Sequence, residues 1–143
     1  MYQQNIYINV CNKYGMNTKN KGTSAERELI QMFWESKWAS FRAAGSGSAR
    51  HPCPDIIAGN ILRKLAIECK INKSTYQYLK KGEIKDLKLF CDYFGAEPWI
   101  AVKFQKIGWF FLTLEDLKET KEGFVVSEEI ARNKGLLFTE LIE

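Results

Sequence analysis

The first regular pattern along the chain is a set of apolar residues at helical spacing within residues 23–37. These residues recur at intervals of three or four: Leu29, Ile30, Phe33 and Trp34. Thr23 and Glu26 stand three apart, which is the spacing of a capping box at a helix start. The pattern therefore predicts a helix from about Thr23 to Lys37. Glu26 falls on its inward face, because it precedes the apolar residues by three, four and seven positions.

Short runs typical of β-strands follow this helix, and a polar loop separates the first two. The expected strands cover Ala39–Ala44, Pro54–Ala58 and Lys64–Ile71, and the loop runs from Gly45 to Pro52. Further along the chain we expect a helix over Glu83–Phe94, a hairpin of Pro98–Phe104 with Gly108–Thr113, and a strand at Phe124–Val126. This order of elements predicts an α/β fold in which helices flank a central mixed β-sheet.

Residues 1–20 lack a sustained apolar pattern and are interrupted by asparagines, so we expect a poorly ordered N-terminal extension there. The whole chain has 143 residues, a length typical of one domain, and we assign residues 21–143 to a single domain. No run approaches the ~20 apolar residues of a membrane span, and no signal-peptide pattern is found. We therefore expect a cytoplasmic protein without a membrane partner.

The amino-acid composition further limits the kinds of protein and partner that the sequence allows. An apolar fraction of 45% excludes a disordered protein, and 21 Lys and Arg against 17 Asp and Glu permit a polyanionic partner. The four cysteines contain no CxxC pair, which argues against a zinc site and favours reduced thiols. A lysine cluster fits either a solvated helix face or contacts to DNA phosphates: Lys80, Lys81, Lys85 and Lys88. Four aromatic residues are expected in the core or at a dimer interface: Trp99, Trp109, Phe110 and Phe111.

Two registers are open for the strands at 54–58 and 64–71. Pairing Ala58 with Leu65 and Ile56 with Ile67 gives a common apolar face and places Asp55 opposite Glu68. A tight turn at residues 59 and 60 would instead pair Asp55 with Lys64 and separate the two acids. We favour the first register because it keeps the apolar residues of both strands together. Ala66, on the face of Glu68, is then expected to border an open cleft.

Two facing carboxylates repel unless a cation lies between them or one of them takes up a proton. Mg²⁺ prefers oxygen ligands, so Asp55, Glu68 and the backbone carbonyl of Cys69 form a candidate metal site, which Glu26 could complete. Lys70 lies on the same strand face as Glu68. It could stabilise the transition state, or position and help to deprotonate a water. Such a set is suited to metal-assisted hydrolysis of phosphodiesters.

The same residues carry a resemblance to a known class of enzyme. Pro54-Asp55, twelve further residues and then Glu68-Cys69-Lys70 resemble the PD-(D/E)xK nuclease motif. Four segments match in order and spacing, and they cover residues 21–29, 41–48, 54–59 and 66–70. Together they resemble the archaeal Holliday junction resolvases.

This resemblance implies a restriction-endonuclease-like nuclease core and assigns roles to individual residues. The metal-binding acids fall on Glu26, Asp55 and Glu68, and the catalytic lysine falls on Lys70. The basic residue that contacts phosphate falls on Arg42, and the catalytic serine falls on Ser46, with Ser48 as an open alternative. We also expect DNA contacts from several residues near these motifs: Lys21, Gly45, Gly47 and Ser48. Glycines there would let the backbone approach a phosphate closely.

The resemblance also implies cofactor and partners. Mg²⁺ is the expected cofactor, with Mn²⁺ able to substitute, and no small-molecule cofactor is expected. The partners are a second copy of the chain in a homodimer and four-way junction DNA, which the enzyme nicks in symmetric pairs during recombination and repair. A nucleoid-associated location follows. Two alternatives stay open: a nuclease of the same fold with another DNA target, and a DNA-binding module without catalytic activity.

Overall fold

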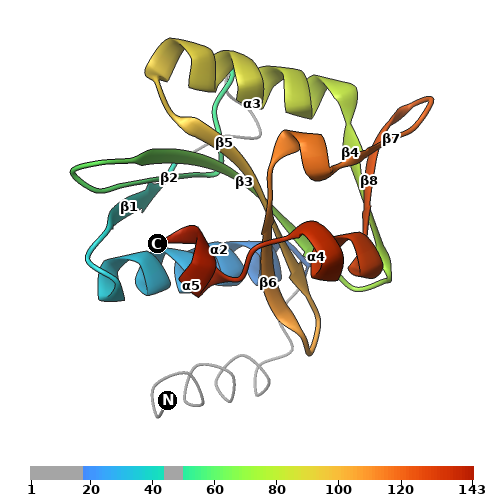
Figure 1. The fold of residues 1–143 in the computed structure, drawn as a ribbon, viewed down its shortest axis with the longest axis horizontal. Coiled ribbons are helices and arrows are strands. Elements are labelled where there is room, and N and C mark those ends of the chain that lie inside the picture. The colour runs from blue at the N-terminus through green and yellow to red at the C-terminus, as the bar shows by residue number, and fades with distance from the viewer. Residues whose placement is uncertain (1–17, 44–49) are drawn as a thin grey trace.

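The computed structural model describes residues 18–43 and 50–143, with the backbone alone for residues 18–21. Its helices are α2 (Thr18–Glu35), α3 (Lys81–Phe94), the 3-10 turn η2 (Leu114–Asp116), α4 (Glu128–Lys134) and α5 (Phe138–Leu141) (Figure 1). Its strands are β1 (Ala39–Arg42), β2 (Ile56–Gly59), β3 (Lys64–Asn72), β4 (Tyr76–Lys80), β5 (Glu97–Phe104), β6 (Gly108–Leu112), β7 (Lys118–Glu119) and β8 (Gly123–Ser127).

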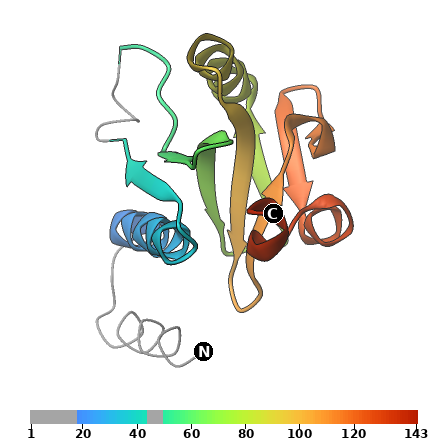
Figure 2. The same cartoon turned by 60° about the vertical axis from the view of Figure 1, so that its left-hand side comes forward.

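The central sheet has five strands in the order β1-β2-β3-β5-β6. Strands β3 and β5 are parallel and the other neighbours are antiparallel, so the sheet is mixed. A second sheet, in the order β4-β8-β7, lies on the side away from α2 (Figure 2). The expected α/β fold with a mixed sheet between helices is confirmed.

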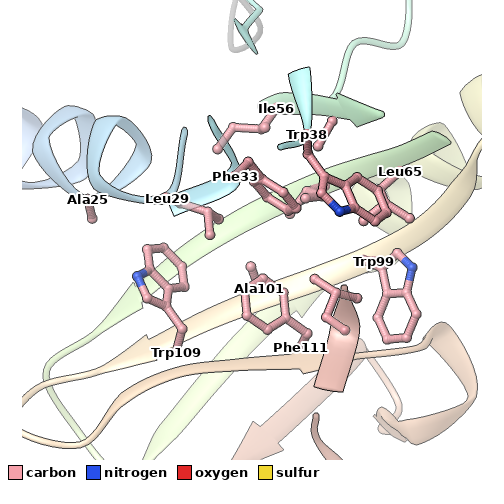
Figure 3. Packing of buried hydrophobic residues seen from close by; sticks show 13 residues of the cluster. Ala25, Leu29, Phe33, Trp38, Ile56, Leu65, Trp99, Ala101, Trp109 and Phe111 are labelled. Carbon is pink, nitrogen blue, oxygen red and sulfur yellow. The ribbon is translucent and has the colours of Figure 1, made fainter. Parts of the chain in front are cut away.

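Two hydrophobic clusters hold these layers together, one on each face of the central sheet. On one face, Leu29 and Phe33 of α2 pack toward Ala101 of β5 and Trp109 of β6 (Figure 3). On the other face, the buried side of α3 packs against β3, β4 and β5. A strand covered on both faces is expected to be apolar at consecutive positions, and β3 follows this rule from Leu65 to Ile67.

The register of β2 and β3 agrees with the favoured prediction. Ala58 pairs with Leu65 and Ile56 pairs with Ile67, and all four side chains belong to the α2-side cluster. The connecting turn is closed by a backbone hydrogen bond from Asn60 N to Arg63 O of 2.9 Å. The tight-turn alternative is therefore wrong.

Three expectations need correction. Helix α2 begins at Thr18, so Thr23 lies within the helix and does not cap it. Its first turns are polar, and a pattern of apolar positions therefore does not reveal them. Residues 18–20 accordingly belong to α2, and the rest of the predicted extension lies outside the described residues. Ala66 borders no open cleft: it is fully buried in the α3-side cluster, because α3 covers that face.

The aromatic residues of the β5–β6 hairpin lie in the core. Trp99 and Trp109 are 8% and 7% exposed, and Phe110 and Phe111 are buried as well. Of the two expected locations, the core is correct. Within residues 18–43 and 50–143, no helix combines the length and the apolar character that crossing a membrane requires.

Arg63 joins the β2–β3 turn to the C-terminal helix. Its guanidinium pairs with Glu97 at 2.9 Å, donates to the carbonyl of Leu141 at 2.6 Å and lies over the ring of Trp38. One planar group with several fixed donors therefore connects three elements, an arrangement that a lysine cannot reproduce.

Arg63→Ala is expected to destabilise the protein by about 1–2 kcal/mol, because it removes hydrogen bonds from a charged donor and the packing on Trp38. Urea unfolding followed by circular dichroism measures this loss. The control is Arg132→Ala, which removes only an i,i+4 ion pair with Glu128 on the surface of α4. Equal midpoints for the two variants would contradict the bridging role of Arg63.

Candidate active site

The candidate site forms where β1 ends and β2 begins, next to residues in the middle of β3. Arg42, the last residue of β1, pairs with Ile56, and Ala43 N donates to Asp55 O at 2.9 Å. Ile56 also pairs with Ile67. The next residues along each chain segment, Asp55 just before β2 and Glu68 on β3, therefore lie opposite each other. The β2–β3 register thus brings together two acids that are far apart in sequence.

Asp55 and Glu68 interact directly. Oδ2 of Asp55 accepts a hydrogen bond from Cys69 N at 2.8 Å, which fixes this carboxylate against β3. Burial raises the pKa of Glu68 to about 8, and the charge of Asp55 and a side-chain hydrogen bond with it add to the rise. Lys70 opposes the increase in pKa without cancelling it. The two acids therefore favour a state with one proton between them, as expected for close carboxyls with little solvent.

Glu26 of α2 forms an ion pair with Arg42. Burial raises the pKa of Glu26, the hydrogen bond from Arg42 lowers it, and the charge of Asp55 raises it again, so that the net shift is upward. The predicted metal ligand and the predicted phosphate contact are thus bound to each other. In the described part of the chain, no three His, Cys, Asp or Glu side chains form a group that could hold a metal ion. The expected convergence of three acids is therefore reduced to the pair Asp55 and Glu68, with Glu26 held by Arg42.

Lys70 lies between two acids. Its Nζ atom is 2.5 Å from Oε1 of Glu83 and 3.8 Å from Oε1 of Glu68. Burial lowers the pKa of Lys70, but the hydrogen bond and charge of Glu83 and the charges of Glu68 and Asp55 raise it more. Lys70 is consequently a cation near neutral pH. This favours charge stabilisation over proton abstraction as its role.

Cys69 presents its backbone to the site and its side chain to the α2-side cluster. Burial, followed by the charges of Asp55, Glu26 and Glu68, raises the pKa of its thiol well above the usual value. The sulfur is therefore a protonated thiol, which is a poor metal ligand. Only the backbone carbonyl of Cys69 stays a candidate ligand.

A pocket next to these groups is lined by residues of α2, of β3 and β4, and of the turn between these two strands: Gly22, Glu26, Cys69, Lys70, Ile71, Lys73 and Gln77. Lys73 and Gln77 were not among the expected site residues. Neither belongs to the matched motif: Lys73 directly follows β3, and Gln77 reaches the pocket from β4. Their donor groups suit an anionic ligand such as a phosphate.

Glu83 is the other site residue that sequence reasoning missed. It lies in the first turn of α3, where Oε2 accepts a hydrogen bond from Lys80 N at 2.8 Å. An acid at this position is typical of a helix start, so the sequence gives no reason to connect it with Lys70. The contact depends on how α3 lies over β3, which only the three-dimensional structure shows.

Some expected DNA contacts are not described by the structure. Gly45, Ser46, Gly47 and Ser48 lie outside the described residues, and Lys21 is described only as part of the α2 backbone. Their predicted roles stay predictions.

A mixed sheet that brings an acid pair and a lysine together on adjacent strands is the arrangement expected of the PD-(D/E)xK nucleases that the sequence motif resembles. The family described as archaeal Holliday junction resolvase (Hjc) matches residues 17–143. This chain belongs to that family.

Individual relatives agree with this assignment. The crossover junction endodeoxyribonuclease Hjc of Archaeoglobus fulgidus is 40% identical over 129 residues, which cover 85% of this chain and 95% of the relative. The Hjc of Methanocaldococcus jannaschii is 34% identical over 110 residues, covering 77% of this chain and 78% of that protein. A solved structure of the Archaeoglobus fulgidus Hjc, a Holliday junction resolvase, superposes with a TM-score of 0.80 at 37% identity. It is matched over 85% of this chain and 100% of its own.

Proposed function

We propose that this protein is a structure-selective endonuclease that cuts four-way DNA junctions by hydrolysing phosphodiester bonds with the help of a divalent cation. The observation that carries the proposal is the contact between Asp55 and Glu68 beside the protonated Lys70, in a chain of the resolvase family. Relatives named crossover junction endodeoxyribonucleases support the choice of substrate. Such an enzyme acts in recombination and repair, in the cytoplasm at the nucleoid.

The donor set fits Mg²⁺. Asp55 and Glu68 offer carboxylate oxygens next to each other, and the proton that they favour occupies the place a cation would take. The Cys69 carbonyl is a further candidate ligand. Glu26 would join only after Arg42 releases it, for example to a DNA phosphate. Mn²⁺ accepts the same oxygen ligands and is expected to substitute.

Each group has a part in the proposed hydrolysis. Asp55, Glu68 and the Cys69 carbonyl would hold the cation, which when bound would polarise the phosphate and lower the pKa of a nucleophilic water. Lys70 stabilises the negative charge that develops on the phosphate oxygens. Arg42 binds a neighbouring phosphate, Ser46 contributes to catalysis, and Lys21, Gly45, Gly47 and Ser48 contact the DNA. Lys73 and Gln77 extend this contact surface along the pocket.

The activity is tested with a synthetic four-way junction whose strands are end-labelled, in the presence of Mg²⁺. We expect paired nicks at symmetric positions and little cutting of a plain duplex with the same arm sequences. Asp55→Asn and Glu68→Gln should reduce cleavage to background while junction binding in a gel-shift assay is retained. The matched control, Glu122→Gln, removes an exposed acid far along the chain and should cut normally. Equal cutting of duplex and junction would contradict the structure selectivity.

The metal requirement is tested separately. Protein treated with a chelator should not cleave the junction, and added Mg²⁺ or Mn²⁺ should restore cleavage. Isothermal calorimetry of the DNA-free protein should show Mg²⁺ binding that Asp55→Asn weakens, which makes the test independent of activity. Full cleavage in excess chelator would contradict the metal site.

We further propose that the protein acts as a homodimer. Two identical sites related by a two-fold axis suit a junction of nearly two-fold symmetry. A candidate interface is the outer face of α3, where Leu89, Tyr93 and Phe94 are exposed, Tyr93 at 86%. Lys64 of the adjoining strand β3 donates to the Phe94 carbonyl at 3.2 Å and borders this patch. Exposed aromatic and aliphatic residues grouped on one face are typical of an interface.

Tyr93→Glu is expected to convert the dimer to a folded monomer, because it places a charge in the apolar patch. Light scattering coupled to size exclusion measures the mass, and circular dichroism checks the fold. Tyr78→Glu, at an exposed position on β4, is the control and should leave the mass unchanged. A dimer that persists in Tyr93→Glu would exclude α3 as the interface, and a monomeric wild type would contradict dimerisation itself.

A further inference from the structure

Lys70 is held by an acid that belongs to none of the segments resembling the resolvases. We propose that Glu83 is a positioning residue, which holds the Lys70 ammonium at the site and keeps it from moving closer and forming a hydrogen bond with Glu68. This inference rests on the proposed nuclease function and adds a residue of α3 to it. Glu83 acts through Lys70, and we do not assign it a contact with DNA or metal.

The two distances from Lys70 Nζ show which acid holds the Lys70 ammonium in place. Lys70 Nζ is 2.5 Å from Glu83 and 3.8 Å from Glu68, so the short hydrogen bond is made to Glu83. All three side chains are less than one third exposed: 21% for Lys70, 31% for Glu83 and 19% for Glu68. A hydrogen bond between charged groups with limited solvent access is stronger than one on the open surface. Glu83 therefore determines where the ammonium lies.

Glu83 is itself fixed. Its second carboxylate oxygen accepts the hydrogen bond from Lys80 N, so one oxygen is tied to the helix start and the other to Lys70. Helix α3 in turn is anchored by Ile84, Leu87 and Cys91, which are buried against the sheet. Through Glu83, helix α3 fixes the position of the Lys70 ammonium, which therefore does not depend on the flexible Lys70 side chain alone.

Removing Glu83 would change the partner of Lys70. The nearest remaining acid is Glu68, and an ammonium next to two carboxyls in a poorly solvated site pairs with them. Lys70 would then compete with a divalent cation for the Glu68 carboxylate. It would also move away from the phosphate whose charge it is proposed to stabilise. Both effects lower cleavage, and the first also weakens the binding of metal.

The experiment measures single-turnover cleavage of a junction over a range of Mg²⁺ concentrations, together with Mg²⁺ binding by calorimetry without DNA. Glu83→Ala is expected to slow cleavage by about 10–100-fold, the usual effect of removing a group that orients an essential side chain. It should also raise the Mg²⁺ concentration needed for half-maximal rate. Glu83→Gln keeps an oxygen acceptor and should lose less. Glu122→Ala, which removes an exposed acid outside α3 and outside the site, is the control and should match wild type.

A double-mutant cycle separates positioning from a purely structural effect. If Glu83 acts through Lys70, adding Glu83→Ala to Lys70→Ala should change the residual rate by less than about twofold. The double variant should also regain the Mg²⁺ affinity that Glu83→Ala loses. Thermal unfolding checks that each variant is folded.

Several outcomes would overturn the proposal. One is an equal loss of rate from Glu83→Ala with and without Lys70, and another is unchanged Mg²⁺ affinity in Glu83→Ala. A wild type that binds Mg²⁺ but cuts no junction would contradict the proposed function, and the calorimetry would still decide the role of Glu83. A wild type that binds no Mg²⁺ would overturn both.

Discussion

The structure depends on the register between β2 and β3. It pairs Ile56 with Ile67 and Ala58 with Leu65 in the core and, one residue beyond the first of these pairs, brings the carboxyls of Asp55 and Glu68 together. The apolar side chains provide the free energy that stabilises this arrangement, because a slip by one residue would turn them to the opposite face. The free energy gained by burying these apolar side chains thus offsets the unfavourable free energy of placing two acids in a poorly solvated site.

Burial and the acid charges together determine the state of the groups around the pair. Burial raises the pKa of Glu26 and of the Cys69 thiol, and the charge of Asp55 adds to both shifts, while Glu83, followed by Glu68 and Asp55, keeps Lys70 protonated. Arg42 and Glu83 compensate on either side, one as a cation beside Glu26 and the other as an anion beside Lys70. The site therefore holds three neighbouring acids, with Arg42 beside Glu26 at one end and Lys70, paired with Glu83, at the other.

Much of this arrangement could be predicted from the sequence, because local patterns encode it. Alternation of apolar residues predicted β2 and β3 and their register, and the matched motif gave Asp55, Glu68 and Lys70, whereas the strands β4 and β7 were not predicted. Contacts made across elements were not predictable in the same way. The start of α2 at Thr18 has no apolar signal, and Glu83 has the sequence context of an ordinary first-turn acid. The Glu26–Arg42 ion pair joins two residues that were assigned separate roles.

The central claim is that Asp55 and Glu68 hold a divalent cation between them. Its most direct test is a crystal structure of the protein grown with Mn²⁺ and measured for anomalous scattering. We expect one anomalous peak in each site, from a Mn²⁺ ion coordinated by carboxylate oxygens of both Asp55 and Glu68, with Lys70 still paired to Glu83. A site without a peak, or a peak held by other residues while these two acids share a proton, would contradict it.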